Sequence, residues 1–158
     1  VSESGIIEAV NIKTGRSLGR ITFSGNAYPR KIYIAGRNLA FVSDLYNHCL
    51  RAFNPETLEA FDRKIETGPA PEGIDGYGSF AFVVNSGYGD YLSHLPKAGT
   101  ISVIDKNTLR EVQTLPAAPN PVDILVNNIN SNFYCVFRHL PSHAFHSALY
   151  LSGPSDSR

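Results

Sequence analysis

Four aspartates lie in separate parts of the sequence, and if the fold brings them together their carboxylates could hold a hard cation. They are Asp44, Asp75, Asp90 and Asp123. Ca²⁺ takes roughly six to eight oxygen ligands, and carboxylates are among those it prefers. No contiguous stretch has the ligand spacing of an EF-hand loop. The prediction of Ca²⁺ or another divalent cation therefore depends on strands that bring the four residues together. The alternative is that each aspartate lies in a solvated turn.

The polar segment 85–99 is a second candidate site, because it combines tyrosine, histidine and glycine. Long loops in compact domains are often functional, and tyrosine with glycine and serine gives an adaptable contact surface. We therefore predict ligand binding by this segment and by one aspartate outside it. The candidates are Asn85, Tyr88, Asp90, Tyr91, His94 and Asp75. The alternative is that the two tyrosines fold back to cover the edge of neighbouring strands.

Histidines supply candidate acid–base groups and further metal ligands. His48 or His94 could transfer protons beside a bound cation. His139, His143 and His146 are spaced by four and then three residues, so one face of a helix would gather them around Zn²⁺ or Ni²⁺. No helical pattern is convincing there, and the alternative is three solvated side chains. No motif of a serine hydrolase, P-loop, dinucleotide site or zinc protease occurs.

The elements that would position these residues come from a cassette that occurs three times. Each copy begins Asn/Asp-x-x-Thr, continues through a β-rich stretch to Pro-x-x-Ile, and leads into an apolar run. The copies start at Asn11, Asn54 and Asp105, and their prolines are Pro29, Pro71 and Pro121. The threonines are 43 (57 − 14) and then 51 (108 − 57) residues apart, which places one insertion after Ile74. A period in the forties with four strand-like runs is typical of a β-propeller blade.

The repeat predicts an all-β fold in which each complete blade has four antiparallel strands, named A to D from the axis outward. We expect A to D at 31–35, 39–43, 49–54 and 60–66, and again at 72–77, 80–85, 100–105 and 109–115. We expect C and D of a half blade at 5–12 and 16–23, and A and B of another at 122–126 and 133–137. The B runs are nearly all apolar, as expected for strands buried between blades.

The domain prediction is a partial propeller of about three blades, two complete and two half, over residues 1–137. The blade repeats lie near 5–48, 49–99 and 100–137, and residues 138–158 form an off-pattern tail. Propellers typically have about four to eight blades. The remaining blades therefore come either from a longer chain, in a propeller of about seven blades, or from a second copy in a six-bladed ring. We expect a fragment whose natural start lies upstream.

Residues 101–109 (Ile-Ser-Val-Ile-Asp-Lys-Asn-Thr-Leu) and 119–124 (Pro-Asn-Pro-Val-Asp-Ile) resemble the YVTN-type, WD-like propeller repeat of bacterial and archaeal surface and secreted proteins. So do residues 69–75 and 82–86. The resemblance covers about residues 5–137 and departs at Lys31, where the repeat has glycine. It implies an extracytoplasmic location: periplasmic, secreted or cell-surface. It leaves the chemistry open, because similar propellers serve as binding platforms, as parts of redox complexes and occasionally as lyases or lactonases.

Two functions remain open. Ligands of propellers usually bind the face formed by the D-to-A crossings and the B-to-C loops, here called the top face. That face collects residues 29–31, 44–48, 72, 75, 85–99 and 123. The first hypothesis is a non-catalytic module that binds a protein, a glycan or a small ligand there. The alternative is a metal-assisted lyase or lactonase with a site on the axis.

The composition argues against two kinds of partner. Fourteen acidic and fourteen basic residues leave no net charge, so there is no broad attraction to nucleic acid. No apolar run approaches the roughly eighteen residues that would predict a transmembrane helix.

Cys49 and Cys135 lie about two blades apart, too far for the roughly 4.4–6.8 Å between Cα atoms that a disulfide needs, so we expect free thiols.

Overall fold

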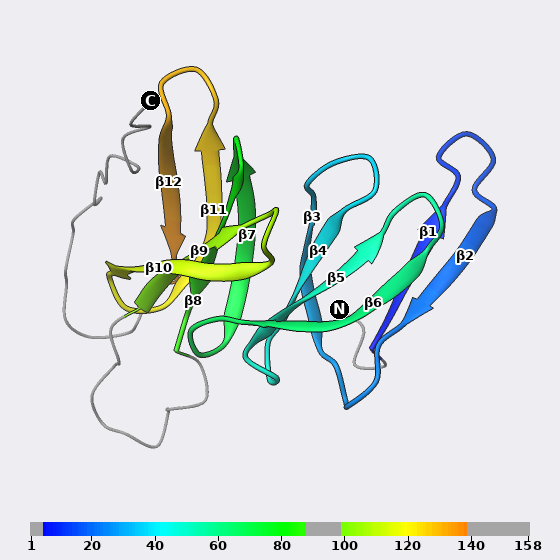
Figure 1. The fold of residues 1–158 in the computed structure, drawn as a ribbon, viewed down its shortest axis with the longest axis horizontal. Helices are drawn as coiled ribbons and strands as arrows, with labels where there is room; N and C mark the ends of the chain where they lie inside the picture. Colours follow the sequence, from blue (N-terminus) through cyan, green and yellow to red (C-terminus); the bar gives the residue numbers. More distant parts are fainter. Residues whose placement is uncertain (1–4, 88–98, 139–158) are drawn as a thin grey trace.

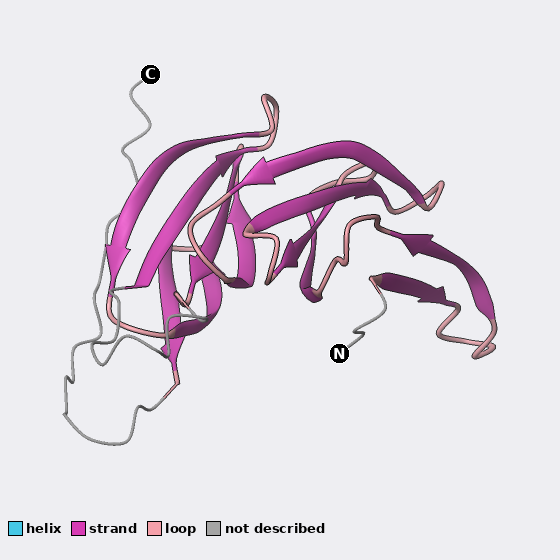
Figure 2. Cartoon of the chain, turned by 90° about the horizontal axis from the view of Figure 1, so that it is seen from below, coloured by secondary structure: helices cyan, strands magenta, loops and turns pink. Residues whose placement is uncertain are grey.

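The computed structural model describes residues 5–87 and 99–138 as β-strands joined by turns (Figure 1). Within those residues no helix is long and apolar enough to cross a membrane, and the regular structure is all strand (Figure 2). The strands are β1 (Ile6–Val10), β2 (Ser17–Thr22), β3 (Pro29–Ile34), β4 (Ala40–Asp44), β5 (Cys49–Asn54), β6 (Glu59–Glu66), β7 (Pro71–Tyr77), β8 (Phe80–Asn85), β9 (Gly99–Asp105), β10 (Arg110–Ala117), β11 (Pro121–Asn127) and β12 (Asn132–Phe137).

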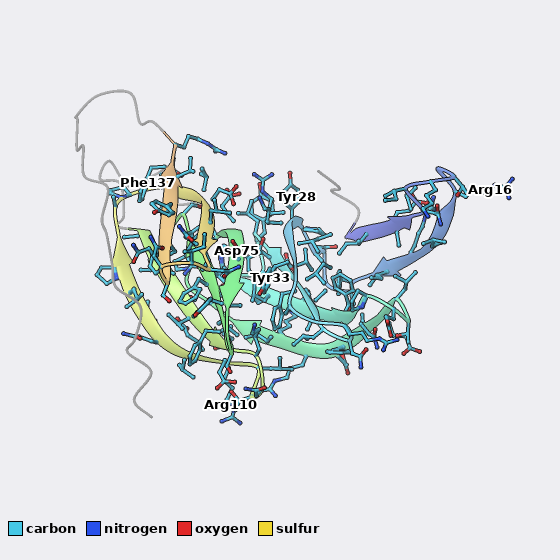
Figure 3. The ribbon with its side chains drawn as sticks, turned by 90° about the horizontal axis from the view of Figure 1, so that it is seen from above. Arg16, Tyr28, Tyr33, Asp75, Arg110 and Phe137 are labelled. Carbon is cyan, nitrogen blue, oxygen red and sulfur yellow. The ribbon has the colours of Figure 1, made fainter. Side chains whose placement is uncertain are left out.

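The strands form two complete blades and two half blades. Strands β3-β4-β5-β6 and β7-β8-β9-β10 are four-stranded antiparallel sheets, whereas β1-β2 and β11-β12 are two-stranded. The inner strands β3, β7 and β11 lie next to one another, and β6 and β10 form the outer side of the arc (Figure 3). This confirms the prediction of an all-β partial propeller. The ends of the predicted runs differ from the observed strands by two residues at most.

The Asn/Asp-x-x-Thr element closes the hairpin between strands C and D. Asp105 Oδ1 accepts hydrogen bonds from the backbone N–H groups of Asn107 at 2.7 Å and Thr108 at 3.0 Å. These N–H groups lower the pKa of the Asp105 carboxyl. Asn11 and Asn54 accept from the two equivalent N–H groups of their own turns. The recurrence of the cassette is therefore explained by a side-chain cap on a turn that must reverse the chain in few residues.

The core lies between neighbouring sheets and is built mainly from strands B and C. Phe41, Leu50, Val83 and Ile104 are fully buried in one cluster between the two complete blades. Burying an aliphatic or aromatic side chain of this size contributes roughly 1.5–3 kcal/mol. Every residue of β4 is buried, including its last two, which are polar. The B strands of the two complete blades, β4 and β8, are thus enclosed on both faces, as their apolar runs predicted.

The two cysteines are free thiols, as the blade spacing predicted. Burial raises the pKa of the Cys49 thiol to about 11, and the nearby Asp44 carboxylate adds to that rise. Burial likewise raises the pKa of Cys135 to about 11. Both groups are therefore uncharged thiols at neutral pH, and their nucleophilic thiolate form is rare.

Candidate functional site

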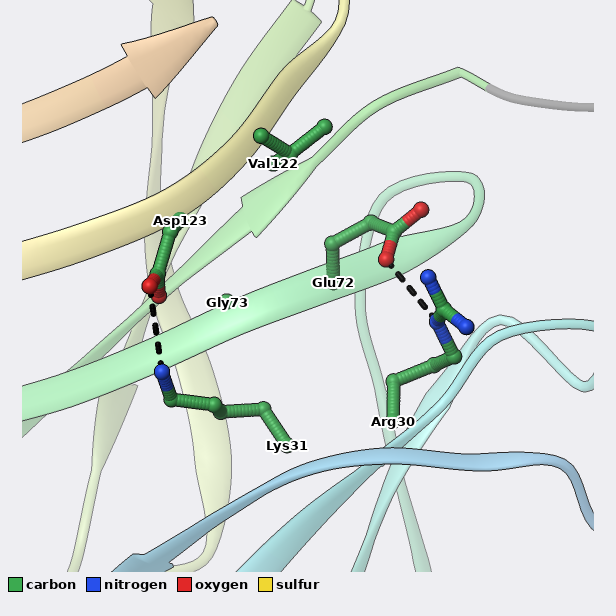
Figure 4. Close-up of a pocket in the computed structure, with 6 residues that line it drawn as sticks. All are labelled: Arg30, Lys31, Glu72, Gly73, Val122 and Asp123. Carbon is green, nitrogen blue, oxygen red and sulfur yellow. Dashed lines mark hydrogen bonds and ion pairs between the residues drawn. The ribbon is translucent and has the colours of Figure 1, made fainter. Parts of the chain in front are cut away.

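The top face is hollowed where the inner strands begin. An open depression of about 220 Å³ is lined by Arg30, Lys31, Glu72, Gly73, Val122 and Asp123 (Figure 4). These are the second and third residues of β3, β7 and β11, each pair following the first proline of its strand. The Pro-x-x-Ile step therefore brings the two variable positions of every unit to one place near the axis.

Two ion pairs cross this depression, from β3 to β7 and from β3 to β11. Arg30 Nε lies 3.0 Å from Glu72 Oε2, and Lys31 Nζ lies 3.0 Å from Asp123 Oδ2. The Glu72 side chain is only 6% exposed, whereas those of Lys31 and Asp123 are 49% and 43% exposed. An exposed pair contributes about 0–1 kcal/mol. Lys31 and Asp123 can therefore separate at little cost and contact a ligand.

Gly73 allows β11 to approach β7 closely under the depression. A Cβ atom at this position would lie 2.5 Å from Asp123 Cα and 2.7 Å from Asp123 Oδ1. Any larger residue would push the two inner strands apart. The glycine thus sets the position of the Asp123 carboxylate, which also accepts the backbone N–H of Ile124 at 3.0 Å.

Asp75, a predicted ligand residue, lies further along β7 and holds two inner strands together. Its Oδ1 accepts the N–H of Gly76 and its Oδ2 accepts the N–H of Val126, both at 2.8 Å. The Tyr33 ring of β3 lies beside it (Figure 3). Burial, and then the Asp75 carboxylate, raise the pKa of the Tyr33 hydroxyl. Both Asp75 oxygens are therefore engaged by backbone groups, below the top-face depression.

Asp44, a candidate metal ligand, is buried at the end of β4 with its side chain 1% exposed. Arg51 Nε donates to Asp44 Oδ2 at 3.0 Å, and the Tyr28 N–H donates to Oδ1 at 2.9 Å. Asn47 Nδ2 lies 3.1 Å and 3.0 Å from the two oxygens. Both oxygens thus already have protein donors, and a cation would have to displace them.

Asn85, another predicted ligand residue, closes β8 at the equivalent place in the next blade. Its side-chain Nδ2 donates to Thr100 Oγ1 at 3.0 Å and to Ser102 Oγ at 2.9 Å. Its Oδ1 is the only buried side-chain polar atom in the described part of the chain without a hydrogen-bond partner. Asn85 is 1% exposed, so it lies beneath the surface from which segment 86–98 leaves β8.

The predicted cation site depends on residues that are only partly described. Within 5–87 and 99–138, no three histidine, cysteine or acidic side chains come close enough to hold a metal ion. Asp44, Asp75 and Asp123 each have separate partners there. The other predicted residues lie outside the described ranges: Tyr88, Asp90, Tyr91, His94, His139, His143 and His146. The prediction of a divalent cation is therefore untested.

His48, a predicted acid–base candidate, is exposed on the top face and accepts a backbone hydrogen bond. The Ala70 N–H donates to His48 Nδ1 at 3.0 Å, which links the B-to-C loop of one blade to the crossing into the next. The bond requires an unprotonated Nδ1.

The structure adds functional candidates that sequence reasoning did not select. Arg30, Lys31 and Glu72 were assigned to the top face but not named as site residues. The sequence could have identified them, because they occupy the two positions after the repeated proline, which the repeat brings to one face. The buried ion pair of Arg51 with Asp44 had no such signal in the sequence, since only the pairing of β4 with β5, in which Arg51 lies opposite Val42, brings the two side chains within reach.

The comparisons with known proteins bear on the fold. No family model matches this chain, and no curated protein matches it. Among solved structures it is similar to Kuenenia stuttgartiensis hydrazine synthase, with a TM-score of 0.72 and 15% identity over 87% of this chain and 37% of that one. It is also similar to a functionally unknown protein from Desulfotomaculum acetoxidans DSM 771, with a TM-score of 0.68 and 15% identity over 86% of this chain and 42% of that one.

A third similar structure is the dihydro-heme d1 dehydrogenase NirN in complex with DHE. The TM-score is 0.58 and the identity is 15%, over 81% of this chain and 27% of that one. Hydrazine synthase and NirN have β-propeller folds, so this chain is defined as a partial β-propeller. It spans less than half the length of each of the three. At this identity the likeness concerns the fold alone.

Proposed function

We propose that this partial propeller is a non-catalytic binding module whose ligand occupies the top face at the axis. The observation that carries the proposal is the depression lined by paired charges from three successive inner strands. Propellers present variable residues on a rigid strand framework, and such sites are commonly used for recognition.

The proposed ligand is a protein segment, a glycan or a small polar molecule. Lys31 and Asp123 offer one ammonium and one carboxylate that are both more than two-fifths exposed. The Glu72 carboxylate and the Arg30 guanidinium form the floor, where a fixed pair can orient a polar ligand. Strand β8 ends and β9 begins on this same face, so we propose that segment 86–98, with Tyr88, Asp90, Tyr91 and His94, contacts the same ligand.

We also propose an extracytoplasmic location, either periplasmic, secreted or at the cell surface. The support is the likeness of residues 69–75, 82–86, 101–109 and 119–124 to a repeat of surface and secreted proteins. Separation of the chain's source cells into cytoplasmic, periplasmic and surface fractions tests the location. A chain found only in the cytoplasmic fraction would contradict it.

Chemical-shift mapping tests the proposed site. Isotope-labelled chain is titrated with a panel of glycans and of acidic and basic peptides, and we expect amide shifts concentrated at residues 30–31, 73 and 122–124. Joint replacement Lys31→Ala and Asp123→Ala should weaken that binding at least tenfold. The matched control is Lys13→Ala, which removes an exposed lysine from a distant turn. Binding that survives both the Lys31/Asp123 and the Tyr88→Ala/Tyr91→Ala replacements would place the site elsewhere.

The alternative proposal, a metal-assisted lyase or lactonase, has less support among the described residues, where no three-ligand cluster forms. Calorimetric titration with Ca²⁺ tests it separately. Tight binding that is lost in Asp90→Asn and Asp123→Asn would favour the enzyme proposal over the binding module.

A further inference from the structure

The Lys31–Asp123 ion pair connects two strands that β7 separates. Strand β7 lies between β3 and β11, and each of these strands packs against it (Figure 1). Lys31 Nζ lies 3.0 Å from Asp123 Oδ2, so the two side chains meet across β7 and span the top-face depression (Figure 4). The Arg30–Glu72 pair, in contrast, joins the adjacent strands β3 and β7.

Other hydrogen bonds already hold the three inner strands together. Ser43 is fully buried, and its Oγ accepts the Lys31 N–H at 3.1 Å and donates to the Glu72 carbonyl at 2.6 Å. This serine therefore links β3 to β7. Asp75 Oδ2 accepts the Val126 N–H at 2.8 Å and links β7 to β11. Both links remain when the exposed ion pair opens, so that pair is available for a ligand.

The charges around the depression cancel, which restricts the ligand. Arg30 and Lys31 supply two positive charges, and Glu72 and Asp123 supply two negative charges. An anion bound to Lys31 would lie beside the Asp123 carboxylate that it displaced. A cation bound to Asp123 would lie beside the Lys31 ammonium. Like charges that are close together repel each other, so a ligand with a single charge loses part of what it gains.

We propose that the depression binds a small zwitterion of the amino-acid class, with one carboxylate and one ammonium group. The carboxylate binds Lys31 Nζ, and the ammonium donates to the Asp123 carboxylate. One exposed ion pair is then replaced by two charge-assisted pairs, and neither side chain is left without a partner. A neutral glycan offers only hydroxyl groups, which do not replace the opened ion pair.

Two further features of the depression fit a small zwitterion. Its volume of about 220 Å³ is smaller than the roughly 300–1,000 Å³ of sites for drug-sized ligands, so it suits a molecule of few atoms. Asp123 Oδ1 accepts the Ile124 N–H at 3.0 Å, which fixes the carboxylate. The other oxygen, Oδ2, pairs with Lys31 and is therefore the one that the ligand ammonium takes over.

Three matched small molecules test the ligand class. Isotope-labelled chain at neutral pH is titrated with β-alanine, with butyrate, in which a methyl group replaces the ammonium, and with propylammonium, in which a methyl group replaces the carboxylate. We expect β-alanine to shift the amide signals of residues 30–31, 73 and 122–124. Butyrate and propylammonium should bind there roughly tenfold more weakly, because each of them meets a like charge.

Single substitutions should change which molecule binds. Asp123→Asn removes the negative charge but keeps an oxygen that accepts the Ile124 N–H, and it should make butyrate bind more tightly than β-alanine. Lys31→Gln should favour propylammonium in the same way. The control Glu56→Gln makes the same kind of change in an exposed ion pair with Arg37, outside the depression, and should keep the preference for β-alanine. An ion pair that only stabilises the fold would not reverse these preferences.

The outcomes separate this inference from the proposed function, on which it rests because it names the ligand class of the same depression. If a glycan or a peptide shifts the amide signals of the depression but β-alanine does not, the zwitterion proposal is wrong and the binding module stands. Butyrate and propylammonium that bind there as tightly as β-alanine would lead to the same conclusion. Unchanged preferences in both Asp123→Asn and Lys31→Gln would also overturn the zwitterion proposal. If no glycan, peptide or zwitterion shifts those signals, both proposals are overturned.

Discussion

Strand B ends on Asp44 in the first complete blade and on Asn85 in the second, and each residue faces strand C of its own blade. Asp44 binds Arg51 of β5, whereas Asn85 binds Ser102 of β9. The surrounding backbone is the same in both blades. The N–H after each residue donates to the carbonyl of the residue before the blade's first proline, from Leu45 to Tyr28 and from Ser86 to Ala70.

The difference lies in how many donors each site receives. The Tyr28 N–H donates to Asp44, but the equivalent Ala70 N–H donates to His48 instead. Asn85 Oδ1 is therefore left without a partner among the described residues. A buried carboxylate could not tolerate that shortage, because an unpaired buried charge costs several kcal/mol. The same backbone therefore accepts either the charged pair of Asp44 with Arg51 or the neutral pair of Asn85 with Ser102. The buried carboxylate is stable only where enough hydrogen-bond donors surround it.

The largest effect is expected where the charged pair is broken on one side. Arg51→Met leaves the Asp44 carboxylate buried without its cation and removes the bond from Arg51 Nη2 to the Ser24 carbonyl at 3.0 Å. We expect a loss of about 3–5 kcal/mol in the free energy of unfolding, measured with urea. The matched control Arg63→Met lies on the exposed strand β6 and should cost under about 0.5 kcal/mol. A loss below 1 kcal/mol for Arg51→Met would mean that the buried Asp44 carboxylate does not depend on Arg51.

A transplant of the neutral pair should cost less than breaking the charged one. Asp44→Asn with Arg51→Ser gives the first blade the side chains of the second, and no charge is left buried. We expect the double variant to lose about 1–3 kcal/mol, so that a double-mutant cycle shows a favourable coupling of more than about 1 kcal/mol. Additive losses would mean that the two residues act independently.

Removal of the neutral partner should have a smaller effect. Ser102→Ala takes away the acceptor of the Asn85 Nδ2 group and of the Gly68 N–H. Because Thr100 still accepts from Asn85, we expect a loss of about 1–2 kcal/mol. Ser79→Ala, at an exposed turn position, is the control. A loss as large as that of Arg51→Met would show that the neutral pair contributes as much to the free energy of unfolding as the charged pair.

The smallest effect is expected at the C–D turns. Here the first blade has the amide, Asn54, and the second has the acid, Asp105, which is the reverse of the order at the ends of strand B. The folded pKa of Asp105 lies below its ordinary value of 3.8. Its contribution is therefore present above pH 3.8 and is lost as the pH falls through the folded pKa. Asp105→Asn should unfold less readily in acid than the unmodified chain while matching it near pH 6. An unchanged acid transition would contradict this.

Much of the fold was predictable because it repeats. The Asn/Asp-x-x-Thr turn and the Pro-x-x-Ile step are local devices, and three copies of each set the strand ends to within two residues. The candidate site was less predictable. The segment 85–99 and the four aspartates were chosen for their residue types, but in the structure Asp44, Asp75 and Asp123 have separate partners. The two ion pairs at the depression join residues that are 42 and 92 positions apart in the sequence, so no local pattern predicts them.

The sequence by itself determined the blade, its strand order and its capped turns, because those depend on neighbours within a few residues and on a pattern repeated three times. Only the tertiary structure decided which charged side chains form ion pairs. The partners in the pairs Arg30–Glu72 and Lys31–Asp123 come from different blades. It also decided that Asp44 is buried with Arg51 while Asn85 Oδ1 has no described partner. Side chains become partners through strand pairing and blade packing, which bring together residues far apart along the chain.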